Sequence, residues 1–214
     1  MNSYDVLIKN GRVIDPANNL DGRFDVAISG GCIAEVAAGI EGDAAEVFDA
    51  NGLIVTPGLV DLHAHVYDKV IPLGIDPDHY CLGRGTTTVV DAGSAGADNF
   101  AGFRAFAIDR CRTRILGFLN ISRMGLACSG LGGDSNMPGE LDLMKFVNME
   151  DCVDCIEVNR DVLVGVKIRL SNSIADNGRN EQASFELAVK AARVTKLPLM
   201  THHSFSTVPL EDCP

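Results

Sequence analysis

The sequence of 214 residues contains no tryptophan, and aromatic side chains make up only 6% of it. It also lacks any apolar run that approaches the length needed to cross a membrane. The hydrophobic fraction is nonetheless 46%, so the apolar content is mainly aliphatic. This composition indicates a soluble α/β protein that is long enough to bury a sizeable core.

Basic residues are scarce: 18 lysines and arginines face 29 acidic residues, which gives a formal net charge of −11. This balance argues against nucleic acid and anionic membranes as partners. The first residues, MNSYDVLIKNGR, carry neither the basic region nor the apolar region of a secretion signal. We therefore expect a cytoplasmic location.

The seven cysteines are an odd number, and without a secretion signal they argue against a disulfide framework. Cys152 and Cys155 form a CxxC motif, whose spacing also suits a zinc knuckle or a redox pair. No second CxxC follows, and both cysteines fall on one face of a predicted helix over 149–158. We interpret them as ordinary buried thiols.

The first part of the chain, residues 1–56, reads as short strands joined by tight turns, a small β unit too thin to be stable alone. Asn10-Gly11, inside an alternating apolar and polar pattern, predicts a type I′ hairpin. Thr56-Pro57-Gly58 marks the predicted boundary, so that residues 57–214 form the second domain.

After Pro57 the pattern alternates between strands and helices, which predicts a parallel sheet with crossover connections. Asp98 is the expected N-cap of the second helix. The predicted strands are 59–65, 86–91, 114–121, 165–169 and 197–202, and the predicted helices are 78–84, 98–112, 142–158 and 181–195.

The stretch PGLVDLHAH, residues 57–65, places Asp61, His63 and His65 two positions apart. On a β-strand these three side chains point to the same face. Two imidazoles so placed can hold one metal ion, and Asp61 can orient a ring from behind. Short HxH patterns also arise by chance, but aliphatic neighbours and the preceding Pro-Gly favour the metal interpretation.

The second strand ends at Asp91, and Gly93, Ser94 and Gly96 lie in the loop that follows. In a β/α barrel the carboxyl ends of the strands face the active site, so Asp91 is a candidate catalytic residue. The alternative is that Asp91 caps a turn and that the glycines only permit tight geometry.

Lys167 lies inside the apolar strand VGVKIRLS, where a buried ammonium is costly unless it is paired or neutral. An ammonium cannot ligate a metal, but a neutral amine can react with carbon dioxide to give an anionic carbamate that bridges two cations. From the strand alone, a lysine that pairs with an acid or extends its amine to solvent is the simpler interpretation. His202 ends the fifth strand, and His203 faces the opposite side. A lone histidine here is more often structural.

These segments together resemble the amidohydrolase superfamily, in its dihydroorotase- and hydantoinase-related branch. The likeness is greatest to the amidohydrolase/deacetylase group, through GTTTVVDAGSAG, NISRMGLA, VGVKIRLS and LPLMTHHS. The resemblance implies a (β/α)8 TIM barrel preceded by part of a β-sandwich. It also implies two Zn2+ ions held by His63, His65, a carbamylated Lys167 and His202.

The implied reaction is the attack of a metal-activated hydroxide on the carbonyl of a C–N amide, cyclic or N-acyl, or of a small acyl ester. The expected partner is therefore a small-molecule amide or ester substrate, and a homo-oligomer is left open. A second interpretation is an inactive fragment or a non-catalytic scaffold of the same fold. It is raised because only five barrel strands are found before Pro214, so that the family's sixth-strand histidine and eighth-strand aspartate cannot be placed.

Overall fold

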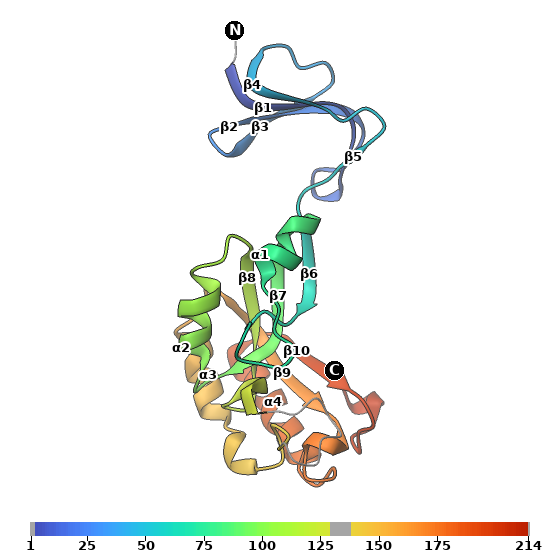
Figure 1. Ribbon diagram of the computed structural model, residues 1–214. Coiled ribbons are helices and arrows are strands. Elements are labelled where there is room, and N and C mark those ends of the chain that lie inside the picture. Colours follow the sequence, from blue (N-terminus) through green and yellow to red (C-terminus); the bar gives the residue numbers. More distant parts are fainter. Residues whose placement is uncertain (1–2, 129–137, 214) are drawn as a thin grey trace. The chain divides into compact units, whose positions relative to one another are not determined.

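The computed structural model describes residues 3–128 and 138–213, which divide into two units, Met1–Leu59 and Val60–Pro214. Figure 1 shows a small β unit and a larger α/β unit. No helix in the described part of the chain is long and apolar enough to span a bilayer.

The N-terminal unit is one mixed sheet of five strands, in the order β3-β2-β1-β4 with β5 also paired to β1 (Figure 1). A small apolar cluster formed by Tyr4, Leu7, Ala27 and Ile40 supports it. The strands are β1 (Ser3–Asp15), β2 (Leu20–Ser29), β3 (Cys32–Ala37), β4 (Asp43–Asp49) and β5 (Ile54–Val55).

The predicted hairpin at Asn10-Gly11 is wrong, because β1 continues through both residues with a shift of register between Ile8 and Gly11. Asn10 has a φ of +65° and its amide donates to Asp25 at 2.7 Å, so these residues form a bulge and not a reversal. The chain turns instead at η1 (Pro16–Asn18), where the carboxylate of Asp15 accepts amide hydrogen bonds from Ala17 and Asn18.

The second unit contains a five-stranded sheet in the order β10-β9-β8-β7-β6, which is the order of the strands along the chain. The pairings β7–β8, β8–β9 and β9–β10 are parallel, and the sheet curves as half of a barrel (Figure 1). The predicted parallel α/β architecture of TIM-barrel type is confirmed. The strands are β6 (Leu59–Ala64), β7 (Thr86–Gly96), β8 (Arg114–Asn120), β9 (Leu163–Leu170) and β10 (Leu199–His203).

All helices of this unit except η7, which follows β10, lie in the crossovers between these strands, and apolar side chains pack between the helices and one face of the sheet. The buried residues include Phe100, Phe103, Ile156, Ala188 and Ala191, opposite Leu119, Val166 and Ile168 of the strands. The helices are α1 (Pro77–Tyr80), η2 (Leu82–Arg84), α2 (Phe100–Phe103), η3 (Arg104–Ile108), η4 (Gly125–Cys128), η5 (Met144–Phe146), α3 (Met149–Glu157), η6 (Asn172–Ile174), α4 (Glu181–Thr195) and η7 (Leu210–Asp212).

Helix α4 has the predicted bounds, whereas the other predicted helices are shorter or divided. Asp98 does not cap α2, because the cap position belongs to Asn99 and Asp98 forms an ion pair with Arg123 at 2.9 Å. Helix α3 begins at Met149, the start predicted for the helix that carries the CxxC motif and later than the start of the 142–158 range, because the side chain of Asn148 caps it by accepting the amide of Asp151. Cys152 of this helix is buried and Cys155 half-buried, as expected for thiols that pack.

Candidate active site

The histidines and the lysine singled out in the sequence lie in the carboxyl half of three strands or directly after one of them. His63 lies on β6 and His65 directly after it, Lys167 lies on β9, and His202 lies on β10. The rings of His63 and His65 are 5.6 Å apart between centroids. The strand pairing places Met200 opposite Lys167 and His202 opposite Arg169, so the two strands bring Lys167 and His202 to one end of the sheet.

The electrostatic surroundings of the histidines show that these groups are neighbours. Burial, followed by the charge of Lys167, lowers the pKa of both His63 and His202. Burial lowers the pKa of His65 to about 4, and the nearby His63 and Lys167 add to the effect. A neutral imidazole, which can offer a lone pair to a metal, is therefore the form of His65 at neutral pH.

Lys167 is only 1% exposed, and its Nζ has no hydrogen-bond partner among the residues that the structure describes. Burial lowers its pKa to about 8, and the neighbouring charge of Arg169 acts in the same direction, against Glu140 and Asp91. An unpartnered amine in a protein interior is costly to keep. A partner for this amine would therefore lower the cost of its burial, and the described residues supply none.

Asp91 lies on β7, fully buried, and its carboxylate is held by the chain around it. It accepts hydrogen bonds from the amides of Val66 at 2.8 Å and Ser94 at 2.7 Å, and from the Ser94 hydroxyl at 2.7 Å. Burial raises the pKa of Asp91, while these hydrogen bonds oppose the rise. The Ser94 hydroxyl in turn lies 3.0 Å from Nδ1 of His65. The predicted catalytic role of Asp91 stays a prediction, and the observed contacts are those of a residue that holds its neighbours.

Asp61, the predicted partner behind the histidines, accepts a hydrogen bond from the backbone amide of His63 at 2.9 Å. Its carboxylate thus fixes the backbone of β6 at the first histidine, and it also raises the pKa of the His63 ring slightly against the effect of burial. The His65 ring contacts the hydroxyl of Ser94 and not the carboxylate of Asp61.

Two charged residues near Lys167 were not identified from the sequence. Arg169 lies two positions beyond Lys167 on β9 and forms a bidentate ion pair with Glu140, whose side chain has no exposed surface. The alternation of VKIR could have indicated that Lys167 and Arg169 share a face. No local signal could have indicated Glu140, which is 29 residues distant.

The donor set determines which metal would fit. The described residues contain no group of three His, Cys, Asp or Glu side chains already arranged to hold a metal ion. His63, His65 and His202 supply imidazoles, which suit zinc, and the charge of Lys167 acts on all three rings. An ammonium can only donate hydrogen bonds, so Lys167 could join these imidazoles in holding a metal only as an anion.

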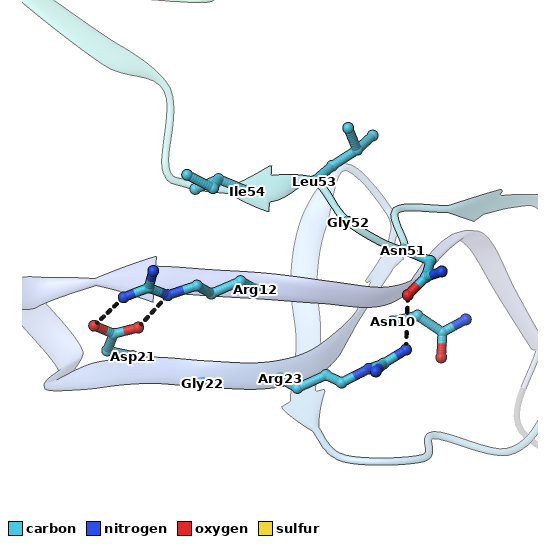
Figure 2. Close-up of a pocket in the computed structure, with 9 residues that line it drawn as sticks. All are labelled: Asn10, Arg12, Asp21, Gly22, Arg23, Asn51, Gly52, Leu53 and Ile54. Carbon is cyan, nitrogen blue, oxygen red and sulfur yellow. Dashed lines mark hydrogen bonds and ion pairs between the residues drawn. The ribbon is translucent and has the colours of Figure 1, made fainter.

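A pocket of about 660 Å3 in the N-terminal unit is unrelated to these residues. Figure 2 shows that its arginines are engaged by their neighbours, Arg12 by both carboxylate oxygens of Asp21 and Arg23 by the side-chain oxygen of Asn51. The pocket contains none of the predicted site residues, and its charged side chains already have partners.

The chain has relatives among characterised enzyme classes, although no protein-family model matches it. It is 37% identical to a deacetylase of Agrobacterium fabrum over 181 residues, which is 83% of this chain and 42% of the relative. It is also 54% identical to a dihydroorotase of Solibacter usitatus over 61 residues, 28% of this chain and 14% of the relative.

Two solved structures share the fold of the chain at 32% sequence identity. A dihydroorotase superposes with a TM-score of 0.82 over 93% of this chain and 51% of its own. An adenine deaminase superposes with a TM-score of 0.78 over 96% of this chain and 52% of its own. The chain belongs to the amidohydrolase superfamily, as the sequence motifs predicted. It spans about half the length of these deacetylase and structural relatives.

Proposed function

We propose that the protein acts in metal-dependent hydrolysis of a C–N amide bond, cyclic or N-acyl, or of a small acyl ester. The single observation that carries the proposal is the buried Lys167 amine, which lacks a hydrogen-bond partner in the described residues and lies near three histidines. A chain that only needed to fold gains nothing from such a lysine, because an aliphatic side chain of similar volume would pack there at lower cost. Relatives named deacetylase and dihydroorotase support the reaction class.

The proposed cofactor is Zn2+, two ions in the fully assembled site, with His63, His65, His202 and Lys167 as the residues that hold them. Zinc would polarise a carbonyl and lower the pKa of a water molecule. The neutral amine of Lys167 would attack the carbon of carbon dioxide, forming an N–C bond and releasing one proton to water. The product is an anionic carbamate, and the lowered pKa of Lys167 increases the neutral fraction that can react.

The proposed substrate is a small molecule that carries an acyl group on nitrogen or oxygen. The deacetylase match extends over 83% of this chain at 37% identity, and a dihydroorotase structure matches 93% of it at 32% identity, so both linear acylated substrates and cyclic amides are proposed. We propose no nucleic acid or membrane as a partner, in line with the excess of acidic residues. A cytoplasmic location and a homo-oligomer remain expectations.

The test is to measure zinc content and turnover of the protein in parallel, with bicarbonate in the medium and a panel of N-acyl, O-acyl and cyclic amide substrates. Lys167→Ala should lose bound zinc and activity, and short carboxylic acids should restore part of both. Lys190→Ala, which removes a lysine from α4, away from the candidate site, is the matched control and should change neither. Equal zinc content in the Lys167→Ala variant and the unmodified protein would exclude the carbamate. A protein that binds no zinc would support the alternative, a non-catalytic scaffold of this fold.

A further inference from the structure

One hydroxyl group connects a buried carboxylate to a histidine of the candidate site. Ser94 has no exposed surface, and its Oγ lies 2.7 Å from Oδ2 of Asp91 and 3.0 Å from Nδ1 of His65. Asp91 and Ser94 are close in sequence, whereas His65 lies 29 residues before Ser94. The contact is therefore made by the fold and not by a local turn.

The number of hydrogen atoms available for donation determines the direction of these two hydrogen bonds. A serine hydroxyl has one hydrogen to donate, and an ionised carboxylate can only accept. Both oxygens of Asp91 already accept backbone amides, Oδ1 that of Ser94 and Oδ2 that of Val66, and these hydrogen bonds favour the ionised carboxylate against the effect of burial. The Ser94 hydrogen must then point to Asp91, which leaves Oγ only a lone pair to offer to His65. The hydrogen of that second contact therefore comes from Nδ1 of His65.

We propose that Ser94 is a positioning residue that holds the neutral His65 ring as its Nδ1-protonated tautomer, leaving Nε2 as the nitrogen that can bind a metal. The consequence for zinc rests on the proposed function, whereas the tautomer itself does not. A hydrogen-bond partner on one ring nitrogen generally fixes which other nitrogen serves as ligand.

The surrounding backbone keeps the hydroxyl in place. Asp91 accepts a hydrogen bond from the amide of Val66, the residue directly after His65. It also contacts the His65 ring indirectly, through the Ser94 hydroxyl. The amide of Ser94 also donates to Asp91, so the serine is bound to the carboxylate by both its main chain and its side chain. One carboxylate thus sets both the position and the ring orientation of this histidine.

The direct test is nitrogen-15 NMR of histidine-labelled protein without metal at neutral pH, with His65 assigned by the signal that His65→Asn removes. The expected spectrum of the unmodified protein shows a protonated Nδ1 and an unprotonated Nε2. Ser94→Ala should move the His65 ring toward the mixture of tautomers found for a free imidazole. Ser122→Ala is the matched control, because Ser122 is equally buried and its hydroxyl has no hydrogen-bond partner in the described residues.

A protonated Nε2 in the unmodified protein would overturn the proposal, since Asp91 would then carry the proton and Ser94 would donate to His65. An unchanged tautomer in Ser94→Ala would overturn it as well. Zinc titration gives the second readout: Ser94→Ala should bind zinc about 10–100-fold more weakly than the Ser122→Ala control. If no variant and no unmodified protein binds zinc while the Nδ1-protonated tautomer is observed, the proposed function fails and the positioning role of Ser94 stands.

Discussion

Gly93 and Lys167 lie so close that a β-carbon on residue 93 would fall 2.5 Å from Cγ of Lys167. Gly93 also has a φ of +84°, a conformation that favours glycine. Asn120, which pairs with Lys167 across the sheet, donates from its side chain to the Gly93 carbonyl at 3.1 Å. The turn after Asp91 is therefore shaped to admit the stem of the buried lysine.

Gly93→Ala should destabilise the protein and displace Lys167. Alanine at positive φ costs about 1–2 kcal/mol, and the steric overlap adds about 1–3 kcal/mol. Gly85→Ala separates the two effects, because Gly85 has a φ of +87° but no atom within 4 Å of the position that an alanine methyl would take. Urea denaturation should show a larger loss for Gly93→Ala, and zinc binding should fall in that variant alone. Equal losses in both variants would contradict the close packing of Gly93 on Lys167.

Lys167→Met should leave the metal-free protein as stable as before, or more stable by about 1–3 kcal/mol, while activity is lost. Methionine fills a similar volume without a buried amine that lacks a partner in the described residues. Free energies of unfolding measured in the presence of a chelator provide the check. A clear loss of stability would show that the Lys167 amine forms a favourable contact in the folded protein.

Acid should destabilise the metal-free protein partly through His65. Its folded pKa of about 4 lies below the usual value of 6.5, so the neutral ring is the form that the fold favours. This contribution is fully present above pH 6.5 and is lost as the pH falls toward 4, by at most about 3 kcal/mol. His65→Gln should therefore show a shallower decline of unfolding free energy between pH 6.5 and 4. Parallel declines in the two proteins would refute the burial of a neutral ring.

Glu140→Gln should cost about 3–5 kcal/mol of unfolding free energy, because it leaves the charge of Arg169 beside Lys167 without its carboxylate. The double variant Glu140→Gln with Arg169→Met should lose less than the sum of the two single losses. A double-mutant cycle in urea measures this coupling. Additive losses would indicate that the ion pair contributes little.

Cys152 and Cys155 should react slowly with a thiol-specific reagent at pH 8, since burial raises the pKa of Cys152 to about 12 and that of Cys155 to about 11. Only the thiolate is nucleophilic, so both thiols are nearly inert there. Cys32, which is exposed on β3, is the internal comparison and should react first. Rapid, paired oxidation of Cys152 and Cys155 would favour the redox alternative for the CxxC motif.

The features that could be predicted from the sequence are those that a short segment determines. The alternation of VDLHAH predicted a strand, which the structure forms as β6, and the rings of His63 and His65 lie 5.6 Å apart between centroids. Helix α4 matched its predicted bounds because fifteen residues with one apolar face give a strong periodic signal. The predictions at Asn10-Gly11 and Asp98 were wrong for a related reason. Both residues have good local turn or cap chemistry, but Asp25 and Arg123, distant in sequence, bind them differently.

The sequence by itself determined the strand and helix alternation, the paired histidines on and directly after β6, and the single lysine inside β9. Only the tertiary structure decided the partners of these residues. Val66 and Asp91 are 25 residues apart, and both His65–Ser94 and Glu140–Arg169 are 29 residues apart. Such contacts depend on which strand ends and loops the parallel sheet brings together, and no local pattern encodes that distance. The burial of Lys167 on β9 has the same origin, because Gly93 of β7 and Asn120 of β8 lie beside it.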